Sequence, residues 1–94
     1  MPYIAGMTYK ARIEANLAVL SPRELEVIDE SHRHHGHAGW KEGGETHFKV
    51  RIVADAFTGL GRLARHRLIN DLLARELAER IHALAIEARA PGEA

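Results

Sequence analysis

The sequence predicts an α+β domain with the element order helix, strand, strand, helix, strand. Three patterns lead to this fold class. Apolar residues recur every three or four positions over residues 8–20 and again over 62–81, which is the spacing of one buried helix face. Apolar and polar residues alternate over 46–53, which is typical of a strand with one buried face. Short apolar-rich runs over 25–29 and 83–89 complete the set of strands.

The first helix is predicted over residues 8–20. Its apolar stripe has spacings of four, four and three, and consists of Tyr9, Ile13, Leu17 and Leu20. Thr8 precedes the stripe and is a suitable N-cap, because its hydroxyl can accept a hydrogen bond from a free backbone N–H. The helix is expected to end at Ser21, since the residue before a proline, here Pro22, avoids the α region.

Two strands are predicted next, over 25–29 and 46–53. In the second strand one face is apolar and the other is polar. The apolar side chains are those of Phe48, Val50 and Ile52, and the polar ones are those of His47, Lys49 and Arg51. This alternation predicts one buried face and one face in water. Because the two strands flank a long loop, we expect them to pair as an antiparallel hairpin.

The second half of the chain predicts a turn, a helix and a strand. Residues 55–61 indicate a turn or a short helical piece, with Gly59 and Gly61 inside it. One continuous helix is then expected from Arg62 to about Ile81. Its apolar face consists of Ile69, Leu72, Leu73 and Leu77, with Leu68 at the edge. Residues 83–89 follow as a third strand, whose apolar side consists of Leu84, Ile86 and Ala88.

The order of the elements predicts the topology. A strand–helix–strand crossover is right-handed and makes its two strands parallel, so the third strand should run parallel to the second. The result is a three-stranded mixed sheet. Both helices are expected on one face of this sheet, which agrees with the polar alternation of the second strand.

The chain has 94 residues, which predicts one domain over 1–94 with an ordered core of about 8–90. It contains no cysteine, which excludes disulfides, thiolate nucleophiles and an iron–sulfur cluster held by four thiolates of this chain alone. A formal net charge of zero argues against a strong phosphate-binding surface. No apolar run reaches the ~20 residues of a membrane span, and the N-terminus lacks signal-peptide features, so we expect a cytoplasmic protein.

Five of the seven histidines lie in the seventeen residues from Ser31 to His47. Four of them are in the loop between the first two strands, and are His32, His34, His35 and His37. Neutral imidazole is a common ligand of zinc and iron. His34 and His37 are three residues apart across a glycine and could bind one ion. The alternative is a solvated polar loop, or a tract that binds metal only adventitiously.

His82 is a second candidate, at the junction between the predicted long helix and the third strand. An imidazolium is favoured near the negative end of a helix dipole, so a capping role is the alternative for this residue.

A third group could bind phosphate or an acidic partner near a helix N-terminus. It consists of Arg62, Arg65, His66 and Arg67, with Asn70 nearby. The alternative for this group is a solvated helix face paired with Asp71, Glu76 and Glu79.

No motif in the sequence specifies an enzyme. Ser31 is near histidines, but no strand–serine–helix elbow or oxyanion-hole pattern accompanies it. We therefore predict that the protein is not an enzyme.

Four motifs occur in one order over most of the chain. They are SPRELEVIDES, HHGHAG, GGETHFKVRIVADAFTGLGRLARHRLIN and LARELAERIHALAIEARAP. Together they resemble the BolA family from about Tyr9 to Pro91. The blocks GGETHF and RHRLIN, joined to a terminal IHALAI, are specific in combination. The resemblance implies an αββαβ fold similar to class II KH domains, which agrees with the order predicted from periodicity.

The resemblance also implies a monothiol (CGFS-type) glutaredoxin as partner, and a [2Fe–2S] cluster shared with it and with glutathione. In that family the BolA-like protein supplies a histidine near its last strand and sometimes one from the loop between the first two strands. The first corresponds to His82. The second corresponds best to His34, with His37 a close competitor and His35 a further one. No cluster is expected in the isolated chain.

Two other functions stay open. BolA-like proteins are also described as transcriptional regulators of morphology and stress response. A basic surface of Lys49, Arg51, Arg62, Arg65, His66 and Arg67 could bind DNA or a partner. However, the turn Thr58–Gly61 lacks the GXXG form of nucleic-acid-binding KH domains. The loop histidines alone could also make a metal-delivery module.

We interpret His47 as structural or partner-facing. We interpret Arg65, His66 and Arg67 as holding the helix to the sheet or facing the partner.

Overall fold

The computed structural model describes residues 6–31 and 44–93. The helices are α1 Tyr9–Leu17, α2 Arg62–Leu72 and α3 Ala74–Glu79, with 3-10 turns η1 at Ala18–Leu20 and η3 at Asp55–Phe57. The strands are β1 Glu24–Asp29, β2 His47–Val53 and β3 Ala83–Arg89. The predicted cap of α1 is confirmed, because the Thr8 hydroxyl accepts a hydrogen bond of 3.0 Å from the N–H of Ala11.

The three strands form one mixed sheet with β2 in the centre. β1 pairs with β2 in antiparallel orientation, with Val27 opposite Val50. β3 pairs with β2 in parallel orientation, with Ile86 opposite Val50. The predicted hairpin and the predicted parallel third strand are therefore both confirmed.

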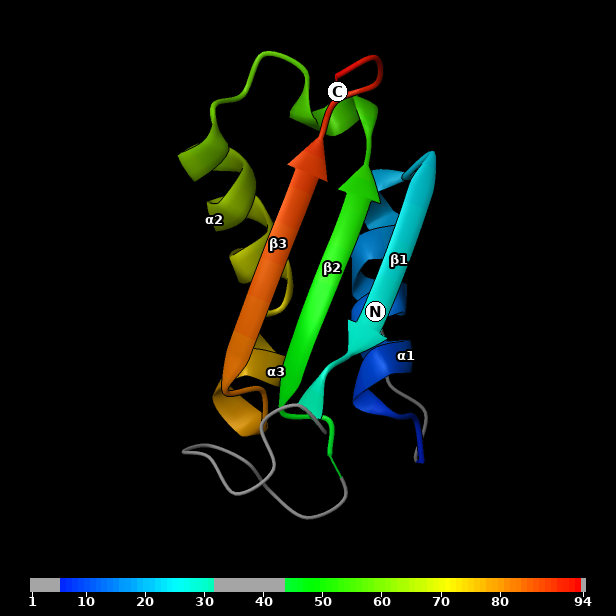
Figure 1. Cartoon of the computed structure of the whole chain (residues 1–94), viewed down its shortest axis with the longest axis vertical. Helices are drawn as coiled ribbons and strands as arrows, with labels where there is room; N and C mark the ends of the chain where they lie inside the picture. Colours follow the sequence, from blue (N-terminus) through cyan, green and yellow to red (C-terminus); the bar gives the residue numbers. More distant parts are fainter. Residues whose placement is uncertain (1–5, 32–43, 94) are drawn as a thin grey trace.

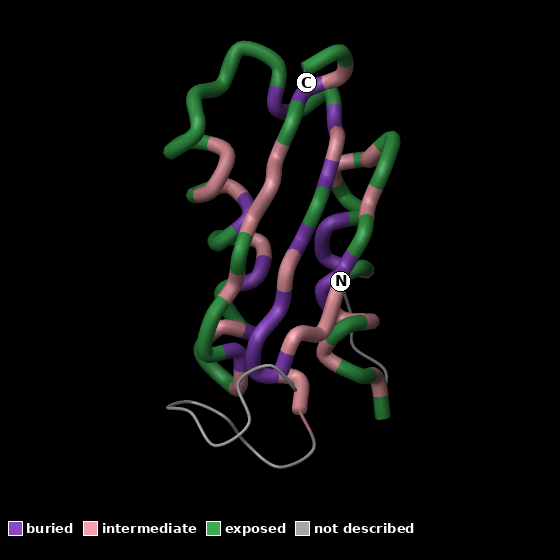
Figure 2. Tube along the Cα trace, viewed as in Figure 1, coloured by how far each residue is buried: buried purple, intermediate pink, exposed green. Residues whose placement is uncertain are grey.

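The helices lie on one face of the sheet, and the other face is open (Figure 1). The core lies between the two layers, and in β2 it contains Phe48, Val50 and Ile52, each at most 2% exposed. Arg51, on the alternate face of the same strand, is exposed, and buried positions alternate with less buried ones along β2 (Figure 2). The apolar face of β2 is therefore the buried one, as the alternation in the sequence predicts. Burial of this face sets the register of the strand.

The expected continuous helix from Arg62 to Ile81 is wrong in one respect. The helix is interrupted at Leu73, where φ is −107° and ψ is 15°. As a result, α2 and α3 are two separate helices. Leu73 itself is fully buried. The break turns α3 toward α1, where the carboxylate of Glu76 is bound. Contacts with another helix therefore decide this bend, and local periodicity carries no sign of it.

Glu76 is fully buried and joins α3 to α1. Its Oε1 accepts a hydrogen bond of 2.9 Å from Asn16, and its Oε2 accepts one of 3.1 Å from Nε of Arg12. The Arg12 guanidinium also pairs with Glu79 at 2.7 Å and lies 4.4 Å from the ring centroid of Tyr9. The expected pairing of Glu76 and Glu79 with the basic group at the start of α2 is wrong, because both acids bind α1.

Arg65 fastens the N-terminal part of α2 to the end of the chain. Its guanidinium donates to the backbone carbonyls of Leu60 and Ala88, at 2.8 and 3.1 Å. It also binds both carboxylate oxygens of Glu93, at 2.6 and 2.8 Å. Such a bidentate pair is geometrically specific. Arg65 therefore holds its helix against β3, which is one of the two roles expected for the RHRLIN block.

We expect the Glu93→Gln substitution to remove part of the acid sensitivity of the fold. The hydrogen bond from Arg65 lowers the pKa of Glu93 to about 2, below the ordinary 4.5. A carboxylate whose folded-state pKa is depressed contributes stability above its ordinary pKa, and loses it as pH falls toward the folded-state value. The urea midpoint of the wild type should therefore exceed that of the variant at about pH 6 and converge with it as the pH falls from about 4.5 to about 2.

Added salt should reduce this difference at about pH 6, because the Glu93 carboxylate is partly exposed. Two curves that stay parallel over the whole pH range would contradict the role of Glu93 in acid sensitivity.

Among the residues that the structure describes, no helix has the length and apolar character needed to cross a membrane.

Candidate functional site

His82 lies between the end of α3 and the start of β3. Figure 1 shows α3 at the lower end of the sheet, where β3 starts. Its backbone N–H donates to the carbonyl of Thr46 at 2.7 Å, and the N–H of Ala83 follows at 3.2 Å. The residue is exposed, and its imidazole makes no hydrogen bond within the described part of the chain. The backbone of His82 is therefore fixed to Thr46, the residue directly before β2, while the residue itself is exposed.

The alternative role of His82 as a helix cap receives no support. The carbonyl of Glu76 near the end of α3 accepts hydrogen bonds of 3.0 Å from the N–H groups of Arg80 and Ile81. His82 comes after these residues, and its own N–H donates to the carbonyl of Thr46 instead. The carbonyl of Glu76 is thus satisfied by backbone groups, as is usual in a tightened last turn.

Both ends of the histidine loop lie at the same end of the sheet as His82. At the near end, Ser31 is 2% exposed, and its Oγ accepts the N–H groups of Thr46 and His47 at 2.9 and 3.2 Å. At the far end, the Arg80 guanidinium donates to the carbonyl of Gly44 at 2.6 and 3.1 Å. Gly44 has a φ of +73°, a conformation that favours glycine. Ser31 binds the residue that anchors His82, and Arg80 precedes His82 by two positions.

Asp29 completes the attachment of the loop ends. Its Oδ1 accepts hydrogen bonds from the N–H and hydroxyl of Ser31 at 2.9 and 2.5 Å, and its Oδ2 accepts the N–H of Glu45 at 3.2 Å. Glu45 in turn accepts the N–H of Tyr9 at 2.6 Å and so caps α1. These roles of Asp29 and Glu45 are not among those predicted from the sequence. The signal for Asp29 is local, because an aspartate often accepts a hydrogen bond from the backbone N–H two residues further on.

His47 occupies the polar face of β2, as the alternation predicts, but it is only 5% exposed. Its Nδ1 lies 2.9 Å from Oγ1 of Thr46. Its ring centroid is 5.4 Å from that of His82, with the two planes tilted by 52°. This burial favours the structural interpretation of His47 and places its ring directly beside the exposed one.

The loop candidates His32, His34, His35 and His37 lie outside the described residues. Within residues 6–31 and 44–93, no three histidine or acidic side chains are grouped as metal ligands. The described part of the chain therefore contributes an exposed imidazole and fixed loop ends to this site.

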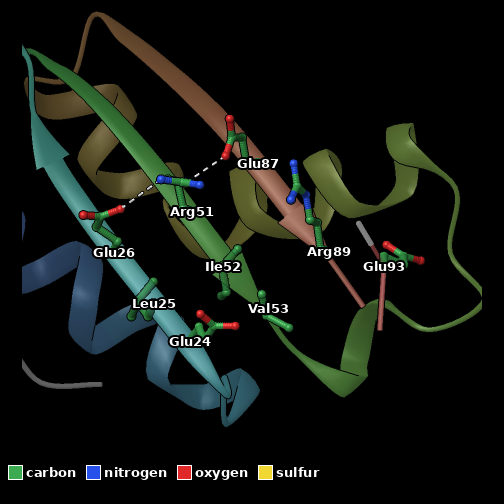
Figure 3. Close-up of a pocket in the computed structure, with 9 residues that line it drawn as sticks. All are labelled: Glu24, Leu25, Glu26, Arg51, Ile52, Val53, Glu87, Arg89 and Glu93. Carbon is green, nitrogen blue, oxygen red and sulfur yellow. Dashed lines mark hydrogen bonds and ion pairs between the residues drawn. The ribbon is translucent and has the colours of Figure 1, made fainter. Parts of the chain in front are cut away.

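Two basic residues of the open sheet face, Lys49 and Arg51, are paired with acids, and Figure 3 shows the contacts of Arg51. Arg51 contacts Glu87 at 2.9 Å and Glu26 at 3.6 Å, and Lys49 contacts Glu87 at 3.5 Å. Partial burial raises the pKa of Glu87, but the charges of Lys49 and Arg51 outweigh it, so this pKa lies below its ordinary value. The groove on this face is lined by both signs of charge, and its lining residues are Glu24, Leu25, Glu26, Arg51, Ile52, Val53, Glu87, Arg89 and Glu93.

The candidate basic residues do not form one surface. Lys49 and Arg51 are on the open sheet face, whereas α2 lies on the opposite face (Figure 1). Arg65 is bound to Glu93, and His66 is half-buried. The remaining members of the group, Arg62 and Arg67, are exposed and have no ion pair within the part of the chain that the structure describes.

These features define a class: a small α+β domain that presents an exposed imidazole at one end of a mixed three-stranded sheet, beside the fixed ends of a histidine-rich loop. The chain belongs to the BolA family, because the family model described as BolA-like protein matches residues 17–93.

Curated relatives agree with this assignment. The chain is 59% identical over 73 residues to an uncharacterized protein in the cobS 5' region of Sinorhizobium sp., which covers 77% of this chain and 78% of that protein. It is 49% identical over 81 residues to the DNA-binding transcriptional regulator BolA of Escherichia coli (strain K12), covering 85% of this chain and 73% of the relative.

A third relative is SufE-like protein 1, chloroplastic/mitochondrial, of Arabidopsis thaliana. It is 48% identical over 92 residues, which are 94% of this chain but 24% of that protein. The solved BolA domain of SufE1 from Arabidopsis thaliana superposes with a TM-score of 0.82 at 46% identity, over 96% of this chain and 100% of that domain. The chain is therefore similar to one BolA domain within a longer protein.

Proposed function

We propose that this BolA-like domain binds a monothiol (CGFS-type) glutaredoxin and supplies imidazole ligands to a [2Fe–2S] cluster shared with it, in iron–sulfur cluster trafficking or iron and redox regulation. His82 is the first ligand. The second comes from the loop, where His34 is preferred over His37 and His35. The glutaredoxin and glutathione supply the thiolates.

The observation that carries this proposal is the position of His82. Its imidazole is exposed and unbonded within the described residues, while its backbone is fixed through Thr46 to both β2 and Ser31. A ligand of a shared centre needs both properties, because it must be reachable from a second protein and yet held in one place. The fixed ends of the histidine loop beside it support a second donor from that loop.

The donor set of the chain also fits a shared cluster. With no cysteine, the chain offers no thiolate, so the thiolate ligands have to come from outside. Imidazole is an accepted ligand of [2Fe–2S] centres, in which it replaces thiolate at one iron and raises the reduction potential. When bound, such a cluster supplies electron-transfer or transferable iron–sulfur chemistry. The residues of this chain orient the imidazoles and dock the partner.

The test is to mix the purified protein with a reconstituted monothiol glutaredoxin and glutathione under anaerobic conditions. We expect a one-to-one heterodimer with a visible circular dichroism spectrum that differs from that of the glutaredoxin alone. A glutaredoxin with its active-site cysteine replaced by serine is the control, and should give no coloured complex. An unchanged spectrum and no heterodimer would contradict the proposal. Tight zinc binding by the isolated domain would instead favour a stand-alone metal-delivery module.

The DNA-binding alternative receives less support from the charges of this chain. The Escherichia coli relative is named a DNA-binding transcriptional regulator. Here, however, three of the candidate phosphate-binding side chains, Lys49, Arg51 and Arg65, are paired with glutamates. Because phosphate contacts dominate the affinity for DNA, carboxylates placed beside these cations weaken such a surface.

A further inference from the structure

The buried His47 lies in a polar cluster in which the number of available protons can be counted. Thr46 is fully buried, Ser31 is 2% exposed and His47 is 5% exposed. Buried polar groups of this kind are almost always hydrogen-bonded, and each hydroxyl has one proton to donate and two lone pairs to accept with. The distances in the cluster decide where each proton goes.

The count begins at Ser31. Its hydroxyl donates to the acceptor Oδ1 of Asp29, 2.5 Å away. Its two lone pairs are used by the backbone N–H groups of Thr46 and His47, at 2.9 and 3.2 Å. The Ser31 hydroxyl therefore has no capacity left to accept from a third donor.

The hydroxyl of Thr46 has two neighbours that could receive its proton. Oγ of Ser31 is 3.4 Å away, which is long for an O–H···O hydrogen bond, and its lone pairs are already used. Nδ1 of His47 is 2.9 Å away. The Thr46 hydroxyl therefore donates to Nδ1 of His47. The neutral imidazole then has its proton on Nε2.

We infer that Ser31 and Thr46 hold His47 in the Nε2–H tautomer, so that His47 positions the ring of His82 and is not itself a metal ligand. In this tautomer Nδ1 accepts from Thr46 and Nε2 carries the proton, which leaves no free lone pair for a metal. The two ring centroids are 5.4 Å apart, so His47 still supports the exposed imidazole by packing against it. The ligand consequence rests on the proposed function, whereas the tautomer does not.

The tautomer can be tested on the isolated protein. Long-range ¹H–¹⁵N correlation spectra distinguish a protonated from an unprotonated ring nitrogen, and would be recorded at about pH 8, where imidazoles are neutral. We expect His47 to have an unprotonated Nδ1 and a protonated Nε2. The Thr46→Val variant, which removes the donor and keeps the shape, should weaken this preference. A protonated Nδ1 of His47 in the wild type would overturn the inference.

The positioning role can be tested in the complex with the glutaredoxin. The His47→Phe variant keeps a ring beside His82 without any nitrogen, and should hold the cluster with a lifetime within about twofold of wild type. The His47→Ala variant removes the ring and should shorten the lifetime about tenfold, as is typical for residues that orient a ligand. Far-ultraviolet circular dichroism of each variant shows whether it folds.

The outcomes separate the inference from the proposed function. If His47→Phe loses the cluster as completely as His82→Ala, His47 is a ligand and the inference is wrong. If His82→Ala leaves the cluster unchanged, the proposed function is wrong, while the tautomer measured on the isolated protein still stands or falls separately.

Discussion

Replacing His82 with alanine is expected to abolish the visible circular dichroism signature of the shared cluster and to shorten its lifetime about a hundredfold. Loss of a residue that only orients a ligand commonly costs 10–100-fold in metal affinity, and removal of the ligand itself should reach the upper end of that range. The fold should be almost unaffected, because His82 is exposed and is fixed through backbone atoms that alanine also has. We expect a change below about 1 kcal/mol in unfolding free energy.

The control is Arg23→Ala, which also truncates an exposed side chain to alanine, but at the end of the sheet opposite to His82. It should leave the spectrum of the complex and its lifetime as in the wild type. The two variants would be compared after anaerobic reconstitution with the same glutaredoxin. Equal spectra for His82→Ala and the wild type would remove His82 from the ligand set.

The largest effect on stability is expected from Glu76→Ala. Removing this carboxylate takes one acid partner from the Arg12 guanidinium, whose side chain is 12% exposed, and one hydrogen-bond acceptor from the amide of Asn16. Breaking one partner out of a buried ion pair typically costs 3–5 kcal/mol, and a cavity adds to this. Because Arg12 retains its contact with Glu79, we expect about 3 kcal/mol, near the lower end of that range.

Urea unfolding followed by far-ultraviolet circular dichroism would measure this loss. Glu79→Ala is the control, since Glu79 contacts the same arginine but is 36% exposed and should cost less than about 1 kcal/mol. A loss below about 1 kcal/mol for Glu76→Ala would contradict the role of Glu76 as the link between α1 and α3.

Much of the fold could be predicted because its signals are local. The alternation of Phe48, Val50 and Ile52 with polar residues gave the central strand and its buried face, and both are confirmed. The strand–helix–strand order predicted the parallel pairing of β2 and β3, because the chirality of the crossover leaves few alternatives. The break at Leu73 could not be predicted, since its apolar spacing is that of a continuous helix.

The candidate site was only partly predictable. The sequence identifies His82 as a candidate, but it also allows a capping role and does not reveal whether the residue is exposed. Ser31, Thr46 and Arg80 carry no motif strong enough to mark them as the groups that hold the loop ends. Their roles depend on partners in other elements, such as the Gly44 carbonyl that Arg80 binds from 36 residues away.

The sequence by itself determines the order and type of the elements, the direction of the strand faces and the absence of thiolate ligands, because these properties depend on neighbouring residues or on composition. The tertiary structure alone decides which histidine is exposed, which one is buried beside it, and which glutamate loses contact with water. The physical reason is that burial and hydrogen bonding depend on what the rest of the chain places around a side chain. Glu76 and Glu79 are three positions apart, yet one is fully buried and the other is partly exposed.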